Sequence, residues 1–135
     1  MASLLPLNKG KVLDLAAKQA AFAAGKAAED KALDYLQQQG LQLIQRNFRC
    51  KVGEIDLIMQ QGAIVAFVEV KYRQDKTFGG ALFSISTRQQ QRIIRAASLY
   101  LARFAPDSQA RFDVIAVDND NLQWLPNAFT ADYYS

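Results

Sequence analysis

The stretch that decides the fold is Gly53-Glu54-Ile55-Asp56-Leu57-Ile58, followed further along the chain by Glu69-Val70-Lys71. Residues 54–59 and 64–70 are rich in Ile, Leu, Val and Phe, and Gln60-Gln61-Gly62-Ala63 between them is typical of a tight turn. The sequence therefore predicts a β-hairpin that carries carboxylates and an amine on two neighbouring strands.

The register of this hairpin decides which side chains meet. With Gln61-Gly62 as the two loop residues, Asp56 is expected opposite Phe67. Because side chains alternate between the faces of a strand, one face then holds four ionisable residues: Glu54, Asp56, Glu69 and Lys71. Glu54 is expected opposite Glu69, and Asp56 becomes its diagonal neighbour, near enough for both carboxylates to bind one cation.

Four ionisable groups on one face of an apolar hairpin need a compensating partner, since like charges repel and burial removes hydration. The chain has no His and one Cys, Cys50, so the usual zinc ligands are missing. Oxygen ligands favour a hard divalent cation, and Mg²⁺ or Mn²⁺ is therefore expected. The alternative is structural, with Glu69 and Lys71 as a solvated pair on an edge strand and Asp56 bound to turn amides.

A further carboxylate, Glu29, lies upstream in a segment from about Leu13 to Gln39 that predicts a helix ended by Gly40. Glu29 shares the apolar, core-facing side of this helix with residues three, four and seven positions away: Phe22, Gly25, Ala32, Leu33 and Leu36. Asp30 and Asp34 fall on a more polar side. An inward carboxylate needs a partner. Glu54 is expected to support the site from nearby, paired with Lys51 or Lys71, rather than to bind the ion.

Several segments, in order, resemble the YraN family of small bacterial proteins: Gly25 and Glu29, Arg46-Asn47-Phe48-Arg49, Gly53 to Ile58, Phe67 to Lys71, Phe78-Gly79 and Arg111-Phe112-Asp113-Val114. Members of this family resemble PD-(D/E)XK nucleases, in particular archaeal-type Holliday junction resolvases. The resemblance runs from about residue 25 to 117. The chain departs from it at Gln89, near which members often carry Lys, and in a longer N-terminal extension.

The resemblance implies a metal-dependent nuclease that hydrolyses DNA phosphodiester bonds, on branched or structured DNA, in DNA repair or recombination. Position by position, it implies Glu29, Asp56 and Glu69 as catalytic metal ligands and Lys71 as the catalytic lysine. It leaves a homodimer open, because resolvase-like enzymes cut two strands with paired sites. The alternative function is a noncatalytic nucleic-acid-binding or adaptor module that keeps the nuclease fold.

The distribution of basic residues is more informative than the net charge, which is only +3. Residues 87–104 predict a helix opened by a capping box, either Ser86 with Gln89 or Thr87 with Gln90. Its expected core stripe is Ile93, Ala97, Tyr100, Leu101 and Phe104. Another side carries Arg88, Arg92 and Arg95, which would straddle phosphates or, alternatively, form an ordinary solvated face. Arg73 and Lys76, in the polar connection before this helix, are expected to contact a nucleic-acid backbone.

The order of predicted elements is helix, three strands, helix, two strands, which indicates an α/β or α+β domain with a central mixed sheet flanked by helices. The resemblance implies a restriction-endonuclease-like PD-(D/E)XK core. We expect one domain over residues 25–126, a partly helical extension over 1–24 and a tail over 127–135. The final strand is expected to end at Pro126, and Phe129 and Tyr133-Tyr134 to pack on the domain or a partner.

The chain shows no run long and apolar enough to span a bilayer and no basic, apolar start typical of a secretory signal. Cys50 is alone, so an internal disulfide is excluded. A cytoplasmic protein without a membrane partner is therefore the default expectation.

Overall fold

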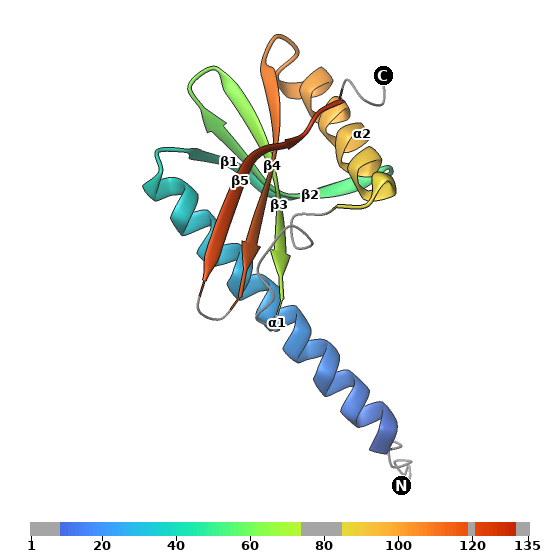
Figure 1. Cartoon of the computed structure of the whole chain (residues 1–135). Helices are drawn as coiled ribbons and strands as arrows, with labels where there is room; N and C mark the ends of the chain where they lie inside the picture. Colours follow the sequence, from blue (N-terminus) through green and yellow to red (C-terminus); the bar gives the residue numbers. More distant parts are fainter. Residues whose placement is uncertain (1–8, 74–84, 119–120, 132–135) are drawn as a thin grey trace, which may run out of the picture.

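The structure is a computed structural model that describes residues 9–73, 85–118 and 121–131. The elements follow in the predicted order: α1 (Lys9–Gln38), β1 (Gln42–Cys50), β2 (Gly53–Gln61), β3 (Ile64–Tyr72), α2 (Thr87–Phe104), β4 (Gln109–Val117) and β5 (Leu122–Phe129). The predicted α+β class is confirmed (Figure 1). No helix in these described ranges is both long and apolar enough to cross a membrane.

The five strands form one mixed sheet whose spatial order is the chain order, β1-β2-β3-β4-β5. β3 and β4 are parallel, whereas the other three neighbouring pairs are antiparallel. A parallel pair needs a crossover connection, and α2 lies within the one between β3 and β4. The meander of the first three strands and the crossover are both as predicted.

The two helices cover opposite faces of the sheet. The second half of α1 packs on one face through an apolar cluster that includes Ala28, Ala32, Leu36, Leu57 and Val68. α2 packs on the other face through a cluster that includes Ile93, Ala97, Tyr100, Phe67 and Phe112. The predicted core position of Phe104 is wrong, since its side chain is 57% exposed at the last residue of α2.

The first half of α1 extends past the edge of the sheet (Figure 1). Its large apolar side chains are exposed, with Leu13 at 70% and Phe22 at 72%. The predicted placement of Phe22 on a core-facing side is therefore wrong. The helical period continues through the whole of α1, but the sheet beneath it reaches only to about Ala28, the first buried residue of the helix.

The hairpin of β2 and β3 has a register two positions away from the predicted one. Its paired residues run from Leu57↔Val68 to Gln61↔Ile64, so the loop is Gly62-Ala63 and the predicted Gln61-Gly62 loop is wrong. Gly62 adopts φ +58°, a conformation that glycine tolerates, and this lengthens β2 by one residue. The alternation of faces is interrupted beside Asp56, because Ile55 and Ile58 both pack on the α2 side, but a shift by two preserves the parity of the pairing. Asp56 is therefore brought towards Glu69 instead of Phe67.

β5 does not end at Pro126 as predicted but continues to Phe129. The register changes from Val114↔Leu125 to Phe112↔Phe129, which leaves a bulge opposite Asp113. The missing amide of Pro126 is tolerated because β5 is an edge strand. Phe129 stacks on Phe112, with ring centroids 5.0 Å apart, and so packs on the domain as expected. Tyr133-Tyr134 lie outside the described residues.

Asp113 anchors this bulge from the middle of β4. Its side chain is fully buried and accepts hydrogen bonds from the Arg111 guanidinium, the Trp124 indole and the backbone amide of Asn127. A buried carboxylate with that many donors is satisfied by its own neighbours. The Arg111-Phe112-Asp113-Val114 segment therefore has a structural role here.

Candidate active site

Asp56 and Glu69 meet where β2 and β3 separate, one position beyond their last paired residues, Leu57 and Val68. Glu69 follows Val68, which points into the α1 side of the core, and so turns to the face that α2 covers, whereas Asp56 lies beside residues of α1. The two carboxyl groups lie close enough for each to alter the pKa of the other. Asp56 also accepts a hydrogen bond of 2.8 Å from the amide of Val70. The hairpin thus delivers the predicted pair of carboxylates.

Burial and neighbouring carboxylates raise the pKa of both carboxyl groups. For Asp56, burial is the main cause, and the Val70 amide works against it. For Glu69, burial followed by the charge of Asp56 raises the pKa to about 8, although Lys71 lowers it. In the absence of another cation, the pair therefore retains a proton near neutral pH.

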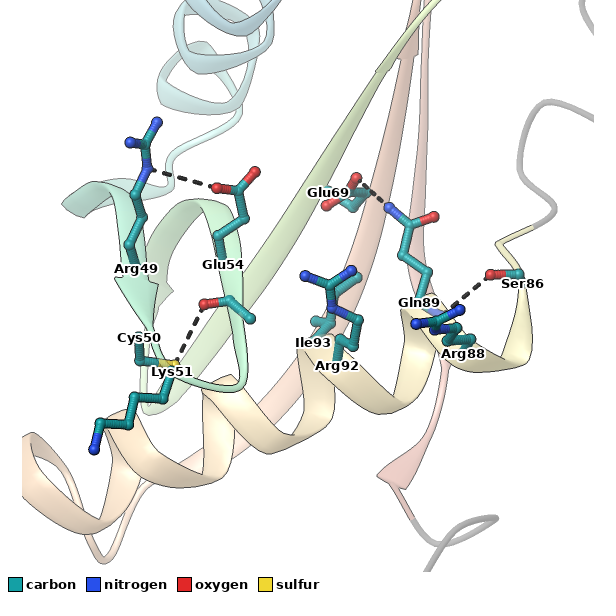
Figure 2. Close-up of a pocket in the computed structure, with 11 residues that line it drawn as sticks. Arg49, Cys50, Lys51, Glu54, Glu69, Ser86, Arg88, Gln89, Arg92 and Ile93 are labelled. Atoms are coloured by element: carbon teal, nitrogen blue, oxygen red, sulfur yellow. Dashed lines mark hydrogen bonds and ion pairs between the residues drawn. The ribbon is translucent and has the colours of Figure 1, made fainter.

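Lys71 is linked to this pair through the side chain of Gln89. The Lys71 ammonium donates to the Gln89 amide oxygen at 3.0 Å, and the Gln89 amide nitrogen donates to Glu69 at 2.8 Å. The direct separation between Lys71 Nζ and Glu69 Oε1 is 3.8 Å, longer than a hydrogen bond. Gln89 therefore bridges the two charged groups, as its bond to Glu69 in Figure 2 shows.

The sequence missed this role of Gln89. Ser86 caps α2 as predicted, since its hydroxyl accepts from the Gln89 amide at 3.1 Å. The Gln89 side chain, however, extends away from the cap towards β3. The available signal was a long polar side chain in the first turn of the crossover helix, next to Arg88.

Glu29 has the partner that its inward position required. It accepts hydrogen bonds from Arg46 at 3.0 Å and from Asn47 at 3.1 Å, both on β1. Its charge contributes to the raised pKa of Asp56, which places it in the same neighbourhood. Within the described ranges, however, no three acidic, His or Cys side chains gather closely enough to hold a metal ion. The role of Glu29 as a third metal ligand stays a prediction.

Glu54 is exposed and pairs with Arg49, its cross-strand neighbour on β1, at 3.5 Å. Arg49 thus takes the place expected for Lys51 or Lys71. The charge of Glu54 contributes to raising the pKa of both Asp56 and Glu69. Glu54 therefore acts on the pair through its charge, from the rim of the site.

Two cavities flank the Asp56–Glu69 pair. The first, here called the basic cavity, has a volume of about 650 Å³ and is lined by charged residues from β1, the β1–β2 turn, β2, β3 and α2: Arg49, Lys51, Glu54, Glu69, Arg88 and Arg92 (Figure 2). The second, here called the α1 cavity, has a volume of about 350 Å³, and its lining includes Phe22, Gly25, Lys26, Glu29 and Asp56. Glu69 faces one cavity and Asp56 the other.

Gly53 sets the distance between β2 and α2 at the basic cavity. A Cβ atom at this position would lie 2.8 Å from the backbone carbonyl oxygen of Arg92. The absence of a side chain therefore allows α2 to approach the hairpin closely, which brings Arg88 and Arg92 to the same cavity as Glu69.

The predicted nucleic-acid contacts lie in different places. Arg88 and Arg92 line the basic cavity, whereas Arg95 is exposed further along α2, outside that lining. Arg73 is exposed just after β3, and its backbone amide donates to Val117 at 3.1 Å. Lys76 lies outside the described residues.

Comparison with known proteins identifies the family. Residues 28–117 match the sequence model described as "Uncharacterised protein family UPF0102". The UPF0102 protein of Janthinobacterium sp. (strain Marseille) is 58% identical over 108 residues, which cover 80% of this chain and 88% of that protein. Its counterpart in Shewanella loihica is 55% identical over 78% of this chain and 92% of its own length. This chain therefore belongs to the UPF0102 family, which is the YraN family.

Proposed function

We propose that this protein is a metal-dependent nuclease that hydrolyses DNA phosphodiester bonds. The observation that carries the proposal is the half-buried Asp56–Glu69 pair, linked through Gln89 to Lys71 and open to the basic cavity. Carboxyl groups with strongly raised pKa values in a cleft are typical of functional sites. Branched or otherwise structured DNA is the proposed substrate, in repair or recombination.

The side chains of this site fit Mg²⁺ or Mn²⁺. Two adjacent carboxylates offer oxygen ligands. Without a metal ion, Glu69 keeps a proton near neutral pH, and a divalent cation would replace that proton by balancing the negative charge of the carboxylate. Asp56 and Glu69 would hold the ion, with Glu29 as a further ligand directly or through water. When bound, the ion would lower the pKa of a water molecule and stabilise negative charge on the phosphate.

The neighbouring side chains would orient the attacking water and bind the phosphates of the DNA. Lys71, held by Gln89, would orient the attacking water and offset the charge of the scissile phosphate. Gln89 would keep the Lys71 ammonium from closing onto Glu69. Arg88 and Arg92 would bind phosphates on the approach to the pair.

A second candidate function is a noncatalytic nucleic-acid-binding or adaptor module. One observation favours it: Glu29 is bonded to Arg46 and Asn47, and the described residues contain no three-ligand cluster. The acidic pair weighs against it, since a binding protein would gain affinity for phosphates by losing carboxylates.

Cleavage of a panel of labelled DNAs tests the proposal. Single-stranded, duplex, flap and four-way-junction DNA would be incubated with Mg²⁺ or Mn²⁺ and wild-type protein, Asp56→Asn, Glu69→Gln or Lys71→Ala, all purified identically. Asp34→Asn is the matched control, since Asp34 is an exposed carboxylate on α1.

We expect ion-dependent cleavage by the wild type and Asp34→Asn, and a loss of a hundredfold or more, on the order of that for other charge-stabilising residues, in the other three variants. Wild type that binds DNA without cutting it, or variants that cut equally well, would leave the binding module as the function. Sedimentation of the same samples tests the homodimer.

A further inference from the structure

The α1 cavity has an unusual wall. Phe22, Gly25, Lys26 and Glu29 follow one another at helical spacing on a single face of α1, and all four line the cavity. The opposite wall includes Asp56 on β2. The residues of α1 that precede the core of the domain therefore lie beside one of the two proposed catalytic carboxylates.

Phe22 offers an aromatic ring at the entrance to this cavity. Its side chain is 72% exposed, because α1 has left the sheet at this point. An exposed aromatic ring cannot serve the core, but it can stack on a flat ligand. Because Phe22 lines the α1 cavity, a ligand in this cavity can reach its ring.

Gly25 leaves the surface beside Phe22 open. Glycine within a helix costs roughly 0.5–1 kcal/mol relative to alanine. Packing does not require glycine here, since a Cβ atom at Gly25 would meet no described atom within 4 Å beyond its own stretch of helix. The position therefore leaves bare backbone facing the cavity, which suits the close approach of a ligand.

The charges of the α1 cavity select against a phosphate. Three carboxylates line it, Glu29, Glu54 and Asp56, against two cations, Lys26 and Arg49. In the basic cavity the balance is reversed, with four cations and two carboxylates. A neutral, planar group suits the α1 cavity better than a phosphate does.

We propose that the α1 cavity binds an unpaired nucleobase of the DNA strand, stacked on Phe22. This inference rests on the proposed function, and it adds a substrate class: DNA with an unpaired nucleotide beside the phosphate that is cut. The strand crosses from the basic cavity, which takes phosphates, over the Asp56–Glu69 pair. A base must leave a duplex to stack in this way. The volume of about 350 Å³ lies within the range of small-ligand sites.

Fluorescence of a single-stranded oligonucleotide containing 2-aminopurine tests the inference, at low salt and without metal ion so that nothing is cut. Stacking on an aromatic ring quenches this base. We expect quenching with the wild type, and loss of the quenching together with roughly tenfold weaker binding in Phe22→Ala. Leu13→Ala is the matched control, since Leu13 is 70% exposed on the same helix and lies outside the cavity lining.

Added bulk on α1 supplies a second pair of variants. Gly25→Leu places a bulky side chain on the open surface and is expected to abolish quenching. Ala17→Leu places a bulky side chain at an exposed position of the same helix outside the cavity lining and is expected to retain quenching. This pair keeps the test independent of any effect of Phe22 on folding.

Equal quenching by Phe22→Ala and Leu13→Ala would overturn the inference, as would equal quenching of a fully paired duplex. A change in oligomeric state in Phe22→Ala alone, measured by sedimentation, would assign the surface to a second copy and would also overturn it. Cleavage without quenching would leave the nuclease standing and remove the base site. Quenching without cleavage would support the base site while the proposed catalysis fails.

Discussion

The basic cavity and the α1 cavity lie on either side of the Asp56–Glu69 pair but differ in how their walls are held. In the basic cavity, α2 lies close to the hairpin at Gly53, so Arg88 and Arg92 project from a helix that is packed on the sheet. In the α1 cavity, one wall is an exposed part of a helix that carries Phe22 beyond the sheet. The difference separates a surface suited to phosphates from one suited to a flat, neutral group. The variants below change residues of one cavity, of the other, or of the carboxylate pair between them.

The largest effect is expected at the pair itself, in the pH dependence of stability without metal. The pKa of Glu69 rises from 4.5 to about 8 on folding, so the native state keeps a proton that the unfolded chain has released. The free energy of unfolding should therefore fall as the pH rises between these values, by at most about 1.4 kcal/mol per pH unit. Denaturant unfolding at several pH values in a chelator measures this slope.

Glu69→Gln should flatten that slope, because glutamine does not ionise, while Asp34→Asn should keep it. Mg²⁺ at pH 8 should stabilise the wild type more than Glu69→Gln, since a bound ligand favours the native state. The raised pKa of Asp56 acts in the same direction as that of Glu69. An unchanged slope in Glu69→Gln would show that Glu69 does not hold the proton.

The next effect concerns the basic cavity. Arg88→Ala combined with Arg92→Ala should weaken DNA binding by roughly tenfold or more and reduce the slope of log affinity against log salt by about 2. Arg95→Ala, on the same helix but outside the lining, is the control and should change neither. Titrations by fluorescence anisotropy at several salt concentrations measure both quantities. Equal losses at Arg95 would mean that α2 carries only a general basic face.

A smaller effect is expected at Gln89, which joins the basic cavity to Lys71. Gln89→Ala removes the acceptor of the Lys71 ammonium and a donor to Glu69, so kcat should fall about fivefold to tenfold while KM stays constant. Gln91→Ala, two residues along α2, is the control. Steady-state cleavage kinetics separate the two constants. A change in KM alone would assign Gln89 to DNA binding instead of to the positioning of Lys71.

The two glycines, one beside each cavity, should differ in their effects on stability. Gly53→Ala forces a methyl group against the Arg92 carbonyl and should destabilise the protein by about 1–3 kcal/mol. Gly25→Ala meets free space and should stabilise α1 by roughly 0.5–1 kcal/mol. Urea unfolding measures both. A destabilising Gly25→Ala would show that this stretch of α1 is packed in solution.

Local sequence signals predicted several elements well. α2 begins and ends at the predicted residues, Thr87 and Phe104, because an N-cap at Ser86 and a regular apolar stripe define it locally. The meeting of Asp56 with Glu69 was also predicted, although the register was wrong by two positions. That error did no harm, since a strand repeats its facing every two residues and only an odd shift would have separated the carboxylates.

The misses depend on contacts that a local pattern does not contain. Phe22 has the helical phase of a core residue, but the extent of the sheet beneath α1 is a tertiary property. The reach of Gln89 to Glu69 depends on where the crossover places α2. β5 continues through Pro126 because Asp113, on another strand, binds the amide of Asn127.

Arg46 on β1 also restrains the roll of α1 about its long axis. Its guanidinium binds Glu29 and, at 2.6 Å, the adjacent Asp30, two carboxylates about 100° apart around the helix. Two contacts at different angles oppose rotation, and a continuous helix transmits that restraint along its length. Phe22 lies seven residues upstream, about two turns or 10 Å away. Arg46 therefore helps to fix the direction in which Phe22 points, two helical turns from the carboxylates that it binds.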